Sequence, residues 1–160
     1  MVKASEHCDA QWVIAGPVEA AIKEQLEGAQ SENFTLAGYL DRPQVVDALR
    51  RAMVGLCVLH PTVNYIDSMP IKLFEYMAAG IPVIASDFPL WRELVGDSGA
   101  AIFVDPLDPE AIGHAIQSLL DDPTRAEQMG AAGKARVMGG FHWGVERDRL
   151  VHLYKDLLSI

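Results

Sequence analysis

The stretch Asn64–Phe88, NYIDSMPIKLFEYMAAGIPVIASDF, has the pattern of a loop, a helix, a tight turn and a buried strand. We expect the helix to begin near Pro70, because proline is favoured at the first helical position, where its missing N–H would have no intrahelical partner. Gly80 supplies a residue that can end the helix in the left-handed conformation. The apolar run Pro82–Ala85 then predicts a short buried strand.

Helical spacing predicts which side of this helix is buried. The apolar residues that recur on one face are Ile71, Phe74, Met77 and Ala78. Lys72 and Glu75 lie one turn apart on a neighbouring face. These two polar side chains are therefore available to a ligand or to each other.

The N terminus of the predicted helix is a candidate anion site. Its first amides have no intrahelical acceptor and carry a partial positive charge, which favours a phosphate or diphosphate. The carboxylates of Asp67 and Glu75 add acceptors for sugar hydroxyls, so the arrangement fits a nucleotide-sugar. An alternative stays open on spacing alone, in which Lys72 and Glu75 form an ordinary surface pair and Asp67 is a loop carboxylate.

The same segment resembles the C-terminal half of the retaining GT-B glycosyltransferases of family 4. The signature of that family is an acidic residue, seven intervening residues and a glutamate, followed by a small-residue helix and a PVIAS-type strand. Asp67 and Glu75 have this separation, and Tyr76–Ser86 continues the pattern. The first acidic position is usually glutamate in the family, so Asp67 has a shorter reach. The resemblance extends from about Ala10 to the C terminus.

The resemblance implies roles for the residues of the predicted site. Glu75 is expected to accept both ribose hydroxyls, and Asp67 is expected to be the catalytic residue that faces the donor sugar. The diphosphate is expected to bind the segment around the helix start, which consists of Ser68, Met69, Pro70, Ile71 and Lys72. The backbone around Tyr39 and Leu40 would border the base, and Gly16 lies at the same edge of the sheet.

The implied reaction is transfer of a glycosyl group from a nucleotide diphosphate sugar to an acceptor, with retained anomeric configuration. Positioning and stabilisation of the leaving diphosphate would supply most of the catalysis, without a metal or a separate cofactor. The segment Lys72–Pro89 is most similar to bacterial enzymes that build envelope polysaccharides. Two alternatives stay open: a non-catalytic nucleotide-binding module, and a flavodoxin-like regulatory domain. The regulatory class expects clustered acids after the first strand, where this chain has Gly16 and Pro17.

The rest of the sequence predicts alternating strands and helices. Apolar runs predict further strands at Trp12–Ala15, Phe34–Gly38, Val54–Leu59 and Ala101–Val104. Helices are predicted at Val18–Ala29, after a cap at Asp41, at Pro89–Val95, after caps at Asp108 and Asp122, and at Gly144–Leu158. Alternation of this kind is typical of a doubly wound parallel sheet covered on both faces. We expect a single α/β domain over residues 1–160.

Several of these elements have apolar faces that we expect to be buried. The strand Trp12–Ala15 is expected to be buried, and the helix after it packs through Ala21, Ile22 and Leu26. The helix after Asp41 has an inner stripe of Val45, Val46, Leu49, Ala52 and Met53. The last helix is expected to pack through Leu150, Leu153, Tyr154 and Leu157. Trp143 is expected to anchor the start of that helix.

By the resemblance, this domain begins with a strand and turn that carry an Arg and a Lys for the diphosphate. Neither that strand nor its basic pair is found before Trp12. We therefore expect an N-terminally truncated domain that lacks its first, central strand. The strands Trp12–Ala15 and Val54–Leu59 would flank that place in the order 3-2-1-4-5-6. In one arrangement these two strands pair with each other, with about 4.8 Å between them. In the other they stay about 10 Å apart and leave a vacant strand position between them.

We favour the second arrangement, in which open strand edges invite self-association. The acceptor-binding N-terminal domain of such enzymes is also missing from this sequence. We therefore expect the isolated chain to be inactive in sugar transfer.

Composition disfavours several classes of protein. The net charge of -9 argues against a nucleic-acid partner. No signal peptide or membrane-length apolar run is visible, and membrane contact is not indicated, so we expect a cytoplasmic protein with Cys8 and Cys57 reduced. Gly130–Lys134 lacks the length and the Ser or Thr of a phosphate-binding P-loop. His142 and Glu146 have no third ligand, so no metal site is expected.

Overall fold

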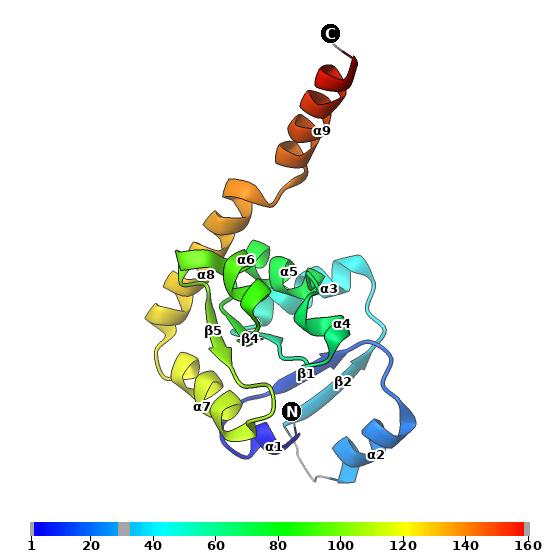
Figure 1. Ribbon diagram of the computed structural model, residues 1–160. Helices are drawn as coiled ribbons and strands as arrows, with labels where there is room; N and C mark the ends of the chain where they lie inside the picture. Colours follow the sequence, from blue (N-terminus) through cyan, green and yellow to red (C-terminus); the bar gives the residue numbers. More distant parts are fainter. Residues whose placement is uncertain (1, 29–32, 159–160) are drawn as a thin grey trace.

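The computed structural model describes residues 2–28 and 33–158, in which strands and helices alternate (Figure 1). The strands are β1 (Trp12–Ala15), β2 (Phe34–Gly38), β3 (Gly55–Cys57), β4 (Val83–Ser86) and β5 (Ala101–Val104). The helices before β4 are α1 (Val2–Ser5), α2 (Ala20–Gly28), α3 (Arg42–Arg51), α4 (Val63–Ile66) and α5 (Ile71–Ala79). Those after β4 are α6 (Pro89–Val95), the 3₁₀ turn η1 (Gly96–Ser98), α7 (Pro109–Leu120), α8 (Pro123–Gly140) and α9 (Trp143–Leu158). All five predicted strands are confirmed, although β3 is shorter than predicted.

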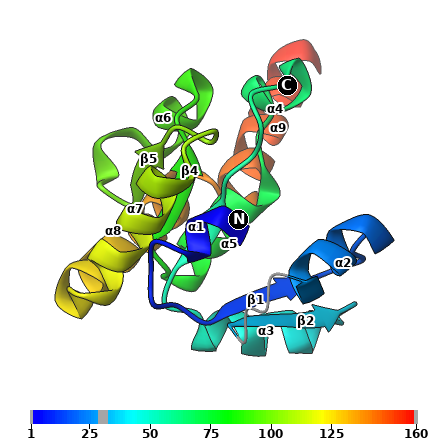
Figure 2. The ribbon, with the colours of Figure 1, turned by 90° about the horizontal axis from the view of Figure 1, so that it is seen from below.

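All described strand pairs are parallel, as the alternation of strands and helices predicts. The strands form two sheets, in the orders β1-β2 and β3-β4-β5. Figure 2 shows the β1-β2 pair set apart from β4 and β5. No ladder joins β1 to β3 within residues 2–28 and 33–158, so the expectation that these two strands stay unpaired is confirmed.

Strand β4 lies at the centre of the larger sheet and is buried along its whole length. Val83 and Ala85 belong to a cluster with side chains of α5 and α6, which include Leu73 and Trp91. Ile84 belongs to a second cluster, with side chains of α1, β1, β5, α7 and α8. Because neighbouring residues of a strand point to opposite faces, β4 joins both halves of the core.

Three predicted helix caps are confirmed. Asp41 forms a capping box with Gln44 at α3, which has Pro43 in its first turn. Asp108 accepts hydrogen bonds from two amides at the start of α7, and Asp122 accepts one at the start of α8. Both helices have proline at one of their first two positions, where a missing N–H costs little.

The predicted buried face of α5 is confirmed for Met77 and for Phe74, which is partly buried against the core, but the buried face is turned toward Leu73. Leu73 and Met77 are the buried residues of this helix, whereas Ile71 is 72% exposed and Ala78 is also exposed. The apolar residues around the helix are numerous enough to fit more than one face, and the position of β3 and β4 selects the face that contains Leu73.

The first half of the chain is also more exposed than predicted. In β1 only Trp12 is buried, and Val13 and Ala15 are exposed. Helix α3 buries none of its residues, so the inner stripe predicted for it is wrong. In α2 the prediction holds for Leu26, which is buried, but not for Ile22. These elements form the smaller sheet or follow its strands in the chain.

Helix α9 projects away from the body of the molecule (Figure 1), and none of its residues is buried. The prediction that it packs through Leu150, Leu153, Tyr154 and Leu157 is wrong, because all four side chains are exposed. Trp143 is 71% exposed and does not anchor the helix. No described helix is long and apolar enough to cross a membrane.

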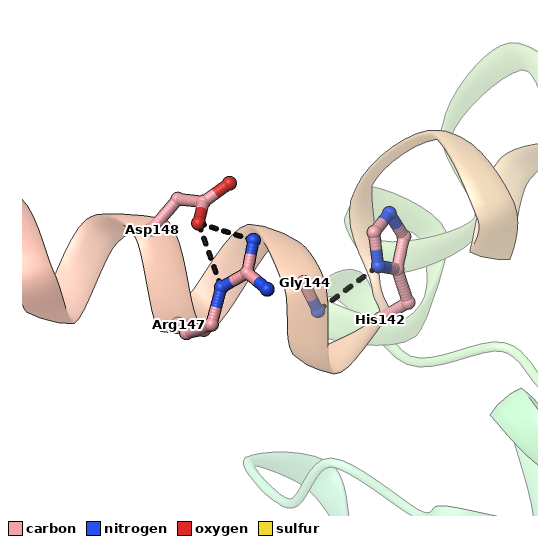
Figure 3. Close-up of polar contacts among 4 residues, drawn as sticks. All are labelled: His142, Gly144, Arg147 and Asp148. Carbon is pink, nitrogen blue, oxygen red and sulfur yellow. Dashed lines mark hydrogen bonds and ion pairs between the residues drawn. The ribbon is translucent and has the colours of Figure 1, made fainter.

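Local contacts define the start of α9 (Figure 3). The Gly144 N–H donates to Nδ1 of His142 at 3.1 Å, and Arg147 donates to the carboxylate of Asp148. A Cβ on Gly144 would lie 2.8 Å from the His142 ring, so the ring can approach only because Gly144 has no side chain. These short-range contacts set the path of the chain between α8 and α9.

Glycines allow α8 to approach α5 closely. A Cβ placed on Gly130 would lie 2.0 Å from the carbonyl oxygen of Gly80, and one on Gly133 would lie 3.1 Å from Cγ of Met77. Gly80 ends α5 in the left-handed conformation, as predicted. The run Gly130–Lys134 is therefore part of a packed helix and not a phosphate-binding loop.

We predict that Gly130→Ala destabilises the fold and that Gly139→Ala does not. The new methyl group at Gly130 would overlap backbone atoms, and overpacking of this kind costs about 1–3 kcal/mol. Gly139 lies in the same helix, and a Cβ there would have no other atom within 4 Å, so alanine should be neutral or stabilise by up to about 1 kcal/mol. Urea unfolding followed by circular dichroism measures both effects. Equal stability of the two variants would contradict the packing role of Gly130.

We also predict that Cys57 reacts with thiol reagents only after unfolding. Its side chain is fully buried, and burial raises its pKa to about 11, with a smaller lowering from Lys72. At about pH 8 only about 0.1% would be thiolate, which is the reactive form. Titration of Cys8→Ser protein with Ellman's reagent, before and after denaturation, isolates Cys57. Rapid labelling of the folded variant would contradict its burial.

Candidate functional site

The predicted site lies in the connection between β3 and α5. Helix α4 forms one turn within it, with the amides of Tyr65 and Ile66 donating to the carbonyl of Thr62. Asp67 follows as the last residue of that turn, and its carboxylate is exposed. The structure therefore places Asp67 at the surface, beyond the carboxyl end of β3, as predicted.

Ser68 is held by three hydrogen bonds. Its amide and its hydroxyl both donate to the carbonyl of Tyr65, at 3.2 and 3.0 Å. Its own carbonyl accepts a hydrogen bond of 2.8 Å from Nε1 of Trp91. The backbone that follows Asp67 is thus fixed both locally and from a residue 23 positions away in the sequence.

The start of α5 differs from the prediction by one residue. Pro70 is the N-cap, with ψ of 121°, and the helix begins at Ile71. The prediction that the helix begins near Pro70 is therefore confirmed, although the extended conformation of Pro70 places it one position before the first helical residue. Proline has no side-chain acceptor, so no side chain of Pro70 caps the first amides of α5. Met69 and Ile71 are exposed on either side of this position.

Lys72 and Glu75 are both exposed on α5. No ion pair joins them in the described part of the chain, so the surface pair of the alternative interpretation does not form there. Lys72 is close enough to Cys57 to affect the pKa of that thiol. Burial raises the pKa of Tyr76, with smaller contributions from Cys57 and from Glu75. The Glu75 side chain is therefore open to solvent and unpaired with Lys72.

The second group of predicted residues lies at the carboxyl end of the smaller sheet. The amide of Gly16 donates to the carbonyl of Gly38 at 2.7 Å, which joins the ends of β1 and β2. Both glycines have positive φ, at 118° and 65°. Tyr39 is 85% exposed, and Leu40 is half-buried. No hydrogen bond or ion pair among the described residues links this group to Asp67–Lys72.

Three residues near the site were not predicted from the sequence. Arg92 forms a two-point contact with the carboxylate of Asp87, and its guanidinium lies 4.6 Å from the centre of the Phe103 ring. Hydrogen bonding from Arg92 lowers the pKa of Asp87. The charge of Arg92 is thus engaged by Asp87, whereas the ammonium group of Lys72 forms no such pair within the described residues.

Two more unpredicted contacts come from β4 and α6. The hydroxyl of Ser86, which is fully buried, accepts from the amide of Leu59 at 2.8 Å and donates to its carbonyl at 2.9 Å. Trp91 is fully buried, and its Nε1 donates to the carbonyl of Ser68. These contacts join positions 27 and 23 residues apart, and no sequence pattern indicates such pairings.

The described residues contain no group of three or more His, Cys, Asp or Glu side chains arranged to hold a metal ion. His142 and Glu146, the two residues that lack a third metal ligand, make other contacts. His142 accepts from Gly144, and Glu146 pairs with Arg149 at 2.7 Å. The charged groups that this site presents are the carboxylates of Asp67 and Glu75 and the ammonium group of Lys72.

The sequence and the fold are both similar to those of known sugar-transferring proteins. Residues 1–136 match the family described as glycosyl transferases group 1. Alpha-maltose-1-phosphate synthase of Mycolicibacterium smegmatis is 30% identical over 150 residues, which are 90% of this chain and 37% of that protein. This chain thus spans well under half of the length of that relative.

Two solved structures have similar folds. Sucrose-phosphate synthase from Thermosynechococcus elongatus superposes with a TM-score of 0.83 and 25% identity, over 99% of this chain and 41% of that chain. The Anabaena protein HepE, solved in complex with UDP, superposes with a TM-score of 0.82 and 13% identity. The match covers 97% of this chain and 44% of the HepE chain. The chain belongs to the glycosyl transferases group 1 family, as the resemblance of Asp67–Ser86 to the C-terminal half of GT-B glycosyltransferases predicted.

Proposed function

We propose that this chain is the donor-binding domain of a retaining glycosyltransferase. The observation that carries the proposal is the geometry of α5 in a member of this family. The helix begins at Ile71 without a side-chain cap from Pro70, a short way after exposed Asp67, and presents Glu75 on its open surface. A helix N terminus attracts phosphate groups, and carboxylates accept hydrogen bonds from sugar hydroxyls.

In this proposal the donor lies across the start of α5. The amides of Met69 and Ile71, on either side of Pro70, hold the diphosphate, and the helix dipole and the free ammonium group of Lys72 offset its charge. Glu75 accepts both ribose hydroxyls. Gly16 and the backbone at Tyr39 and Leu40 border the base, since ligands of parallel sheets bind beyond the carboxyl ends of the strands. The proposed arrangement needs no metal ion and no separate cofactor.

Asp67 is proposed to face the sugar. In the transfer, the bond from the anomeric carbon to the diphosphate breaks and the diphosphate keeps the electron pair. An acceptor hydroxyl forms the new bond on the same face of the sugar, and its proton passes to an oxygen of the departing diphosphate. Stabilising the departing diphosphate lowers the barrier to this step, because charge develops there in the transition state. The carboxylate of Asp67 would orient the donor sugar for it.

The complete activity is proposed to need more protein than this chain. The relatives are more than twice its length, and their remaining part is the candidate source of the acceptor site. A further strand between β1 and β3 would join the two sheets, whose facing strands are not paired with each other. A second copy could also use these edges, which would produce self-association. A cytoplasmic location and a role in bacterial envelope polysaccharide synthesis complete the proposal, the latter supported by the resemblance of Lys72–Pro89.

We predict that Glu75→Ala abolishes most nucleotide binding without unfolding the protein. The side chain is exposed and contributes little to the core, whereas a hydrogen bond to a charged group contributes about 1.5–3 kcal/mol. The loss in affinity should be at least roughly tenfold. Isothermal titration calorimetry with UDP, GDP and ADP measures it, and thermal unfolding monitors the fold.

Glu127→Ala is the matched control, because Glu127 is an exposed helical glutamate outside the proposed site. It should bind as the wild type does. Unchanged affinity in Glu75→Ala would show the ribose assignment to be wrong. If the wild-type chain binds none of the three nucleotides, both the transferase proposal and the alternative of a non-catalytic nucleotide-binding module fail.

Asp67→Asn should lower the rate of sugar transfer more than the affinity for nucleotide. The amide keeps the size of the side chain but loses the charge that is proposed to act on the donor sugar, which is not part of the nucleotide. The assay requires a protein in which this chain is joined to an acceptor-binding domain, with the isolated chain expected to bind nucleotide without transfer. Equal losses in kcat and in nucleotide affinity would place Asp67 beside the nucleotide instead.

A further inference from the structure

The connection between β3 and α5 is attached at both ends to one other segment of the chain. At its beginning, the backbone of Leu59 forms two hydrogen bonds with the hydroxyl of Ser86. At its end, the carbonyl of Ser68 accepts from the indole of Trp91. Ser86 ends β4 and Trp91 lies in α6, so both contacts come from the stretch Ser86–Trp91.

The Ser86 hydroxyl is well suited to hold a backbone segment. It is fully buried. Among the described residues that are buried, Ser86 is the one that hydrophobic packing does not account for, because its side chain is a polar hydroxyl. A hydroxyl can donate one hydrogen bond and accept others, so a single group satisfies both the amide and the carbonyl of Leu59. This extends the attachment of the β3 strand to β4 by two residues beyond Cys57.

Trp91 is held in a fixed orientation. Its side chain has no exposed surface, and its ring packs edge-on against Phe88 with 4.8 Å between centroids. The indole N–H therefore points in a direction set by the core, at the carbonyl of the residue that follows Asp67. Close-packed interiors leave such a ring little freedom to follow a moving loop.

The connection between these two contacts packs against the core at few points. Residues 60–65 are exposed, whereas Ile66 is partly buried and packs against the core cluster that contains Leu73 and Trp91. The N-cap positions of α4 and α5 make no side-chain hydrogen bond. A segment with few buried contacts opens easily unless it is tied to the core. The bonds to Ser86 and Trp91 are such ties, one on each side of α4.

We infer that Ser86 and Trp91 are positioning residues, which set where Asp67 and the start of α5 lie for donor binding. They touch no ligand in this arrangement and act through the backbone of Leu59 and Ser68. The inference rests on the proposed function for its role in donor binding. The attachment of the connection itself can be tested without any nucleotide.

Trp91→Phe tests the second contact, with Trp12→Phe as its matched control. Both tryptophans are buried and pack against a phenylalanine, but Nε1 of Trp12 has no hydrogen-bond partner among the described residues. The two variants therefore remove the same atoms from the core, and only one of them removes a bond to the connection. Thermal unfolding of both variants measures how much stability each loses when the tryptophan is replaced, so that this loss can be separated from the effect on the connection.

Hydrogen exchange of the nucleotide-free 160-residue chain gives the first readout. Trp91→Phe should speed exchange of the amides of residues 60–71 by about fivefold or more, and Trp12→Phe should leave them unchanged. Calorimetric titration with UDP, GDP and ADP gives the second. Trp91→Phe should weaken the binding that the wild type shows by about threefold or more, and the control should not.

Ser86→Ala tests the first contact and keeps the inference falsifiable if Trp91→Phe does not fold. In Ser86→Ala the Leu59 amide should exchange faster than in the wild type. The affinity for nucleotide should fall by about as much as in Trp91→Phe. Ser118→Ala is the control, because that hydroxyl bonds within α7 at 2.8 Å and not to the connection. Ser86→Thr keeps a hydroxyl and should retain more affinity than Ser86→Ala.

The outcomes separate the two proposals. Unchanged exchange in residues 59–71 in both Trp91→Phe and Ser86→Ala would overturn the attachment. Faster exchange with unchanged nucleotide affinity would overturn the positioning role and leave the proposed function standing. If the wild type binds none of the nucleotides, the proposed function and the donor role fail together, and the exchange data still decide whether the attachment exists.

Discussion

Burial of β4 on both faces is the constraint on which the rest of the structure depends. Its residues alternate between two clusters, with Val83 and Ala85 on one side and Ile84 on the other. Each buried aliphatic side chain of this size contributes roughly 1.5–3 kcal/mol, so the strand anchors helices on both faces of the sheet. Because β3 and β5 pair with it in parallel, the connections that follow all three strands leave the sheet at one edge.

The candidate site at that edge divides its tasks between exposed and buried residues. Asp67, Lys72 and Glu75 are exposed, where a ligand can reach them. The groups that fix the backbone beneath them, Ser86 and Trp91, are buried and bond to main-chain atoms. Side chains that meet a ligand need access to solvent, whereas those that set geometry need immobility. The fold supplies the exposed groups from the segment Asp67–Glu75 and the buried groups from the stretch Ser86–Trp91.

Amphipathic patterns in this chain do not all correspond to buried faces. Helices α3 and α9 carry apolar stripes, yet neither buries a residue within the described structure. In contrast, α7 buries Ile112, Ile116 and Leu119 on the face that its spacing indicates. A stripe shows which side of a helix is suited to burial, but burial also requires a second surface. Helix α7 has one in the sheet, and α9 projects from the body (Figure 1).

The sequence by itself determined the local features of this protein. The caps at Asp41 and Asp108, the left-handed Gly80 and the parallel alternation of strands and helices follow from preferences of neighbouring residues, and the structure confirms them. The family could be recognised for the same reason, since its motif is contiguous. Tertiary structure alone decided which face of α5 is buried, that α3 and α9 bury none of their residues, and that Trp91 bonds to Ser68. These features depend on contacts between distant residues, and no local preference encodes the partner of a buried N–H or the surface that covers an apolar stripe.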